Sequence, residues 1–137
     1  MASSRVGTRI RATGLVPFSG SAASWEKLKQ QVGGRLIPVP SLLAPCKDPE
    51  SPACKTRIEE LQNPYFIGEQ PGGTQTSGWL DAWTSAPSVH AVSAQKTEDI
   101  VAAVNFARDN NLRLVVKGGG HSYQGTSNAP DSLLVWT

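Results

Sequence analysis

The clearest pattern of hydrophobic and polar positions lies in the second half of the chain and predicts a β-α-β unit over residues 89–117. Residues 89–92 form a short apolar run typical of a strand, and residues 112–117 predict a second strand. Because a helix is predicted between them, the two strands are expected to be parallel and joined by a right-handed crossover. A third strand is predicted over residues 133–136, directly before the end of the sequence.

The helix of this unit has recognisable ends. Thr97 is a good N-cap, and Glu98 and Asp99 follow it in the first turn, where the helix dipole favours acidic side chains. Arg108 falls in the last turn, and the asparagines at positions 110–111 can close the helix. The residues expected to face the core form one apolar stripe, which consists of Ile100, Val101, Val104 and Ala107.

Two further short helices are predicted in the first half of the chain. Order is expected to begin near Ser24 with an amphipathic helix that stops at Gly33-Gly34. Its apolar face consists of Trp25, Leu28 and Val32. A second helix is predicted over residues 53–62, with Ile58 and Leu61 turned inward, because the Asn-Pro pair that follows favours a helix end.

The rest of the first half predicts irregular structure. Residues 35–43 carry two prolines and are expected to be extended, whereas residues 65–88 show no clear period and are expected to form a long ordered loop. Residues 1–23 contain three arginines, several serines and no acid, a composition typical of a disordered head or, more weakly, of an organelle transit peptide.

Composition and charge narrow the class of protein. The chain has 137 residues, 39% hydrophobic and 18% charged, which corresponds to about one domain and excludes a charge-rich disordered tail. The formal net charge of +2 is too small to indicate nucleic acid or an anionic membrane as the main partner. No run approaches the roughly 18 apolar residues that a spanning helix needs. An α+β fold is therefore expected.

The two cysteines, Cys46 and Cys54, are separated by seven residues that include two prolines. A disulfide between them would be typical of an exported protein, and two unpaired structural thiols are the alternative. Two cysteines alone cannot build a zinc site, and their spacing is not that of a C-x-x-C motif. No metal site is expected, since His90 is the only histidine besides His121.

The candidate chemistry lies in a glycine-rich loop over residues 117–127. Three glycines directly after a strand free the backbone to turn several N–H groups toward one point, which suits phosphate oxygens. Hydroxyl groups follow at Ser122, Tyr123, Thr126 and Ser127. Lys117 either adds positive charge to the loop or is a solvated strand end. The spacing does not match a Walker loop, a Rossmann fingerprint or a nucleophile elbow.

His121 has two readings from the residues alone. It is either a loop histidine that hydrogen-bonds the backbone, or an imidazole that acts as a nucleophile or an anchor at the edge of a cofactor. A family resemblance favours the second reading. Three stretches carry it: Pro87-Ser88-Val89-His90-Ala91-Val92, Thr97-Glu98-Asp99-Ile100-Val101-Ala102-Ala103-Val104, and Gly118-Gly119-Gly120-His121-Ser122-Tyr123-Gln124-Gly125. They closely resemble the start of the flavin domain in FAD-linked oxidases of the vanillyl-alcohol-oxidase type, and within them the berberine-bridge-enzyme-like and oligosaccharide-oxidase branch.

The resemblance implies a division of the chain and a set of site residues. Residues 79–137 would be the incomplete start of a PCMH-type FAD-binding domain, and residues 24–78 an N-terminal extension. His121 would be joined covalently to the 8α carbon of the flavin ring. The pyrophosphate contacts would be Gly118, Gly119, Gly120, Ser122 and Tyr123, with Gly125 in the same loop. The catalytic base of the family would lie beyond Thr137, so no residue here is assigned that role.

The implied function is hydride transfer from a small-molecule substrate to the flavin, which O2 reoxidises. The alternatives are an inactive truncated remnant and a small anion-binding or nucleotide-binding module. Because an apolar strand ends the sequence, the chain is expected to be an N-terminal fragment without oxidase turnover, whose last strand has its neighbours in missing sequence. The cysteine pair favours an exported protein, although the head resembles no secretory signal.

Overall fold

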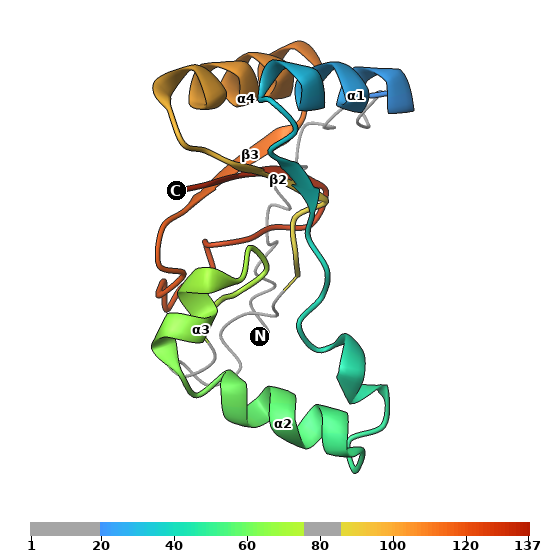
Figure 1. Ribbon diagram of the computed structural model, residues 1–137, viewed down its shortest axis with the longest axis vertical. Coiled ribbons are helices and arrows are strands. Elements are labelled where there is room, and N and C mark those ends of the chain that lie inside the picture. Colours follow the sequence, from blue (N-terminus) through green and yellow to red (C-terminus); the bar gives the residue numbers. More distant parts are fainter. Residues whose placement is uncertain (1–19, 76–85) are drawn as a thin grey trace, which may run out of the picture.

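A four-stranded mixed sheet forms the centre of the fold (Figure 1). The computed structural model describes residues 20–75 and 86–137, so most of the predicted head lies outside the described residues. The strands lie in the order β1-β2-β4-β3. Their bounds are Leu36–Pro38 for β1, His90–Ser93 for β2, Arg113–Lys117 for β3 and Ser132–Trp136 for β4. The expected α+β fold is confirmed, with four α-helices and one 3-10 helix in the described residues.

The last strand of the sequence lies in the middle of the sheet. β4 pairs in parallel with β2 on one side and with β3 on the other, while β1 pairs antiparallel with β2. The predicted parallel arrangement of β2 and β3 is therefore confirmed, with β4 inserted between them. The expectation that the neighbours of residues 133–136 lie in missing sequence is wrong, because both neighbours belong to this chain.

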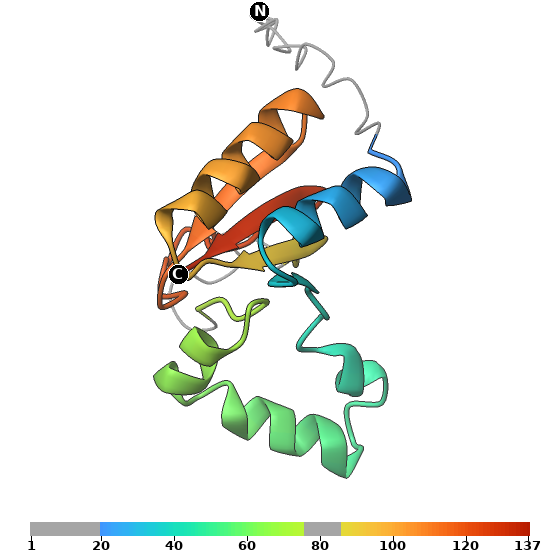
Figure 2. The ribbon, with the colours of Figure 1, turned by 45° about the horizontal axis from the view of Figure 1, so that its top comes forward.

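Two helices cover one face of the sheet. Figures 1 and 2 show α1, Ala22–Gln31, and α4, Thr97–Asp109, side by side above the strands. The core between these layers is apolar, and its fully buried side chains include Leu28, Val32, Val92, Ala103, Leu133 and Val135. The predicted face of α1 and its glycine stop are confirmed, since Gly33 and Gly34 both have positive φ. The helix begins at Ala22, so the predicted head extends a few residues too far.

The buried face of α4 differs from the predicted stripe. Ile100, Val101 and Val104 are exposed, whereas Ala103 and Phe106 are buried against the sheet and α1. The predicted burial of Ala107 is confirmed. The prediction is wrong for the other three residues, because α4 contains more apolar residues than one face can bury. In a helix of this composition, the choice of face depends on the neighbours rather than on the period.

The start of α4 is held by a carboxylate rather than by Thr97. Lys96 is the N-cap, and the Asp99 side chain accepts hydrogen bonds from the backbone N–H groups of Gln95 and Lys96. The Arg35 guanidinium donates to both Asp99 oxygens, at 2.6 and 3.3 Å. The Arg35 hydrogen bonds, followed by those of the backbone, hold the pKa of the buried Asp99 carboxyl below its usual range. The N-cap prediction for Thr97 is thus wrong, and α4 is tied to the chain just before β1.

Two predictions for the middle of the chain are also corrected. The second predicted helix is α2, Pro52–Glu60, in which Cys54 is buried while Ile58 is 46% exposed. The expected burial of Leu61 is confirmed. The predicted loop over residues 65–88 instead begins with α3, Pro64–Glu69, whose N-cap Asn63 accepts from the N–H of Tyr65. Residues 76–85 of this predicted loop lie outside the described residues. The Asn-Pro pair ends one helix and starts the next, because proline is well suited to the first helical position.

A disulfide joins Cys46 and Cys54 at the start of α2. The pairing is one of the two alternatives that the sequence leaves open. Cys46 belongs to the 3-10 helix η1, Ala44–Lys47, so the bond ties η1 to α2.

Reduction and alkylation of this disulfide should lower the free energy of unfolding by about 2 kcal/mol, because the bond closes a short loop and restricts the unfolded chain. Urea unfolding of the oxidised and reduced forms measures the difference. The double variant Cys46→Ser/Cys54→Ser is the control, since the reductant should leave its stability unchanged. Equal stability of the oxidised and reduced native chain would contradict the prediction.

Candidate functional site

The glycine loop begins directly after β3, at the strand end that carries Lys117. Among its first three glycines only Gly120 has a positive φ, of 80°, and Gly125 follows with a φ of 70°. Within the described part of the chain, the backbone N–H groups of Gly119, Gly120, His121 and Ser122 donate to no protein acceptor. Consecutive N–H groups without protein partners are the donors that a phosphate oxygen needs.

The second half of the loop is stabilised by its own hydroxyl groups. The Ser122 Oγ lies 2.7 Å from the Thr126 Oγ1 and accepts hydrogen bonds from the backbone N–H groups of Gln124 and Thr126. Tyr123 is 55% exposed, whereas Ser127 is buried. The hydroxyl group of Ser122 therefore shapes the loop, and its backbone N–H group is the donor that remains for a ligand.

His121 is exposed on the surface of the loop. Its Nδ1 atom lies 3.2 Å from the Oε1 of Gln75, a residue 46 positions earlier in the sequence. The imidazole ring also lies over Gly119, because a Cβ built on that glycine would be 2.9 Å from the His121 Cδ2. The structure therefore brings His121 together with the predicted glycines and with one residue that the sequence did not indicate.

Lys117 is buried beneath the loop, with 1% of its surface exposed. Its ammonium donates to the backbone oxygens of Ile67 and Gln70 and lies 5.6 Å from the centre of the Trp136 ring. The reading of Lys117 as a solvated strand end is wrong. Burial lowers its pKa to about 8, so the side chain is still mainly charged at neutral pH.

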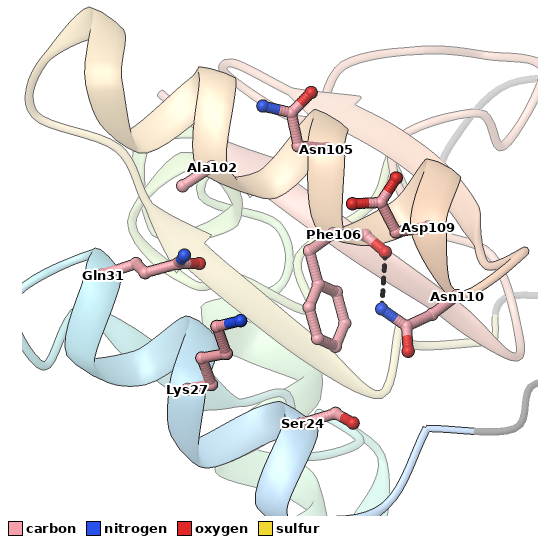
Figure 3. Close-up of a pocket in the computed structure, with 8 residues that line it drawn as sticks. All are labelled: Ser24, Lys27, Gln31, Ala102, Asn105, Phe106, Asp109 and Asn110. Carbon is pink, nitrogen blue, oxygen red and sulfur yellow. Dashed lines mark hydrogen bonds between the residues drawn. The ribbon is translucent and has the colours of Figure 1, made fainter.

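A hollow lies between α1 and α4 (Figure 3). It has a volume of about 240 Å³ and is lined by Ser24, Lys27, Gln31, Ala102, Asn105, Phe106, Asp109 and Asn110. Figure 3 shows that the Asn110 side chain donates to the backbone oxygen of Phe106, at the end of α4. No cluster of histidine, cysteine and acidic side chains within residues 20–75 and 86–137 could hold a metal ion.

Comparison with known proteins identifies the loop region. Residues 89–137 match the family described as FAD binding domain. This part of the chain is therefore similar to an FAD binding domain. The matched region contains β2, α4, β3, the glycine loop and β4, and thus every residue that the sequence predicts as a flavin contact.

Relatives that match most of the chain are also named for FAD. The chain is 33% identical over 135 residues to the FAD-linked oxidoreductase ZEB1 of Gibberella zeae. This match covers 85% of this chain and 23% of the relative. It is 28% identical over 131 residues to the FAD-linked oxidoreductase patO of Penicillium expansum, with the same shares covered. The chain thus spans about a quarter of the length of these relatives. Both relatives are thus named as proteins linked to FAD.

Solved structures share the fold. The VAO-type flavoprotein MtVAO713 of Myceliophthora thermophila C1 matches with a TM-score of 0.68 and 25% identity over 92% of this chain and 25% of that one. MtVAO615 from the same organism matches with a TM-score of 0.65 and 23% identity over 92% of this chain and 26% of that one. Because these structures match 92% of this chain, the common fold includes residues before position 89, where the match to the FAD binding domain begins.

The residues of the glycine loop fit an FAD pyrophosphate. Glycine is required at Gly120, because its φ is 80° and a Cβ there would lie 2.8 Å from the backbone oxygen of Gly73. Close backbone approach combined with N–H groups that have no protein acceptor is how glycine loops bind phosphate groups.

Sequence reasoning missed two residues of this site, Gln75 and Asn128. The Asn128 side chain accepts from the N–H of Ser88 at 2.9 Å and donates to the backbone oxygen of Pro71 at 3.0 Å. Both residues act across distances of 40 positions or more. A local pattern carries no signal for such contacts.

Proposed function

We propose that this chain supplies the flavin attachment loop of an FAD-dependent oxidoreductase, with His121 joined covalently to the 8α position of the flavin. The observation that carries the proposal is an exposed histidine directly after three glycines, within residues that match an FAD binding domain. The relatives named as FAD-linked oxidoreductases support the reaction class. Within that class we favour the berberine-bridge-enzyme-like and oligosaccharide-oxidase branch, on the sequence Gly-Gly-Gly-His-Ser-Tyr-Gln-Gly.

The glycine loop would bind the pyrophosphate mainly through its backbone. The proposed contacts are Gly118, Gly119, Gly120, Ser122 and Tyr123, with Gly125 allowing the turn that closes the loop. The N–H groups from Gly119 to Ser122 have no protein acceptor in the described residues, which supports this role. The hydroxyl of Ser122 would keep its bond to Thr126 and hold the loop in shape.

The share of this chain in the reaction is to bind and orient the cofactor. When bound, FAD supplies the hydride acceptor for a small-molecule substrate, and O2 takes the electrons afterwards. An imidazole tether at His121 would keep the ring system in place during turnover. No residue of this chain is proposed as the catalytic base, and the 137 residues alone are expected to show no oxidase turnover.

The decisive experiment replaces His121 in the complete gene product that contains this segment. We expect flavin fluorescence to survive denaturing electrophoresis in the native protein and to be lost or strongly reduced in His121→Ala, because the variant lacks the attachment atom. Gln124→Ala is the matched control, since Gln124 is exposed in the same loop. The Gln124→Ala variant should retain covalently attached flavin at the native level.

The outcomes of this experiment are distinct. Fluorescence that is undiminished in His121→Ala overturns the histidyl attachment. Partial fluorescence would indicate a second covalent link, which would come from a residue other than Cys46 or Cys54, because these are joined to each other. Absence of bound flavin in the native protein would overturn the proposed function as a whole.

The disulfide also supports a proposal for location. Disulfides persist in oxidising compartments and are rare in the cytosol. Export of the complete protein is therefore favoured.

The expected partners are the small-molecule substrate and O2. In the described residues no helix has the length and apolar character needed to cross a membrane.

A further inference from the structure

We propose that the segment Ile67–Gln75 is a built part of the flavin site, in which Gln75 is a positioning residue that holds the imidazole of His121 through its Nδ1 atom. The segment lies before the residues that match the FAD binding domain, which begin at 89. The inference rests on the proposed function of His121. It adds a residue that sets how the attachment group is presented.

The segment is first tied to the ends of two strands. Lys117, at the end of β3, donates to the backbone oxygens of Ile67 and Gln70, and the Trp136 indole, near the end of β4, donates to the oxygen of Gly68 at 3.3 Å. These oxygens lie in or directly after the last turn of α3, where helix carbonyls have no partner within the helix. Side chains from the sheet thus satisfy the end of α3 and fix its position.

The segment also lies directly against the glycine loop. A Cβ on Gly120 would be 2.8 Å from the backbone oxygen of Gly73 and 3.1 Å from the Ile67 Cγ2. A Cβ on Gly68 would be 3.6 Å from the backbone oxygen of Gly119. The two glycine-rich stretches therefore lie against each other, and at Gly120 they are too close for a Cβ, whereas a Cβ on Gly68 would make only an ordinary contact.

A third tie holds the turn that leads to Gln75. Asn128, which follows the glycine loop, donates to the backbone oxygen of Pro71 at 3.0 Å. Asn128 is buried and its Oδ1 is held by the N–H of Ser88. Lys117 and Asn128 thus hold backbone oxygens on both Gln70 and Pro71, which fixes the turn a few residues before Gln75.

Gln75 is where this anchored segment meets the candidate attachment group. Its Oε1 lies 3.2 Å from the His121 Nδ1. An amide oxygen only accepts hydrogen bonds, so the contact requires a proton on Nδ1 when the ring is neutral. Gln75 would thus select the tautomer of His121 as well as its orientation, since the hydrogen bond made by one ring nitrogen sets the state of the other.

The test measures the tautomer directly, in this chain and without flavin. Nitrogen NMR of the histidine side chains at pH 8.5, where an ordinary imidazole is neutral, should show His121 with its proton on Nδ1. In Gln75→Leu the signal should shift toward the Nε2–H form. Gln75→Glu should keep the Nδ1–H form, because it retains an acceptor oxygen. Gln124→Leu, an identical change at an exposed position of the loop, should have no effect.

A second measurement connects the tautomer with attachment. In the complete gene product, Gln75→Leu should slow covalent flavin incorporation roughly tenfold or more, as misplacement of a reacting group does, while Gln124→Leu should not. An unchanged tautomer in Gln75→Leu overturns the inference. If the tautomer shifts but the native protein holds no flavin, the proposed function fails and the contact between Gln75 and His121 stands. Unchanged folding of each variant is verified by its thermal unfolding midpoint.

Discussion

Gly120→Ala is expected to destabilise the chain by about 2–5 kcal/mol. Gly120 has a φ of 80°, and a non-glycine residue in this conformation costs roughly 1–2 kcal/mol. The added Cβ would also lie 2.8 Å from both the Gly73 oxygen and the Lys117 Cε, and overpacking of this kind costs about 1–3 kcal/mol. Urea unfolding followed by tryptophan fluorescence measures the loss.

Gly118→Ala is the matched control from the same loop. Its φ does not lie in the left-handed region, and a Cβ there would meet only the Thr137 Oγ1, at 4.0 Å. Replacement of such a glycine restricts the unfolded chain and should change stability by no more than about 1 kcal/mol, in the stabilising direction. Equal stabilities of the two variants would contradict the close approach of the loop to the segment before it.

The stability of the chain should rise with pH between about 8 and about 10.5 because of Lys117. Burial lowers the pKa of the folded-state amine to about 8, below the ordinary lysine value near 10.5 that the unfolded chain has. In this range the unfolded chain binds more protons, so the free energy of unfolding increases with pH. Below pH 8 the cost of burying the ammonium is fully present. The difference in pKa corresponds to about 3 kcal/mol.

The pH series is compared with that of Lys117→Met, which keeps a long side chain but cannot titrate. The difference between the two free energies of unfolding removes the contributions of all other groups, provided that the variant folds. Circular dichroism of Lys117→Met at pH 7.5 verifies its fold. A difference that stays constant from pH 8 to pH 10.5 would show that the pKa of Lys117 is unshifted, contrary to its burial.

The order of hydrophobic and polar residues predicts those helices and strands whose ends are set by residues close to them in the sequence. The glycine stop after α1, the strands β3 and β4, and the helix between β2 and β3 follow from local periodicity and capping. The glycine loop is visible for the same reason, since three glycines and a histidine follow a strand directly. The sequence alone therefore predicts the α+β class and the part of the chain that matches an FAD binding domain.

Tertiary contacts decide what the pattern leaves open. α4 carries apolar residues on more than one side, and the sheet and α1 select the side with Ala103 and Phe106, because the small alanine side chain permits close packing. Lys117 has a polar side chain at a strand end, a position that is usually solvated. It is buried here because α3 returns two backbone oxygens to it from about 50 positions away.

The candidate site likewise has a part that the sequence predicts and a part that depends on tertiary contacts. By itself the sequence determined the loop and its histidine, because glycine and histidine have local conformational and chemical signatures. Only the tertiary structure decided that Gln75 faces His121 and that residues 67–75 lie against the loop. These contacts join segments far apart in the chain, and they exist because a sheet ordered β1-β2-β4-β3 brings the ends of β3 and β4 together beneath α3.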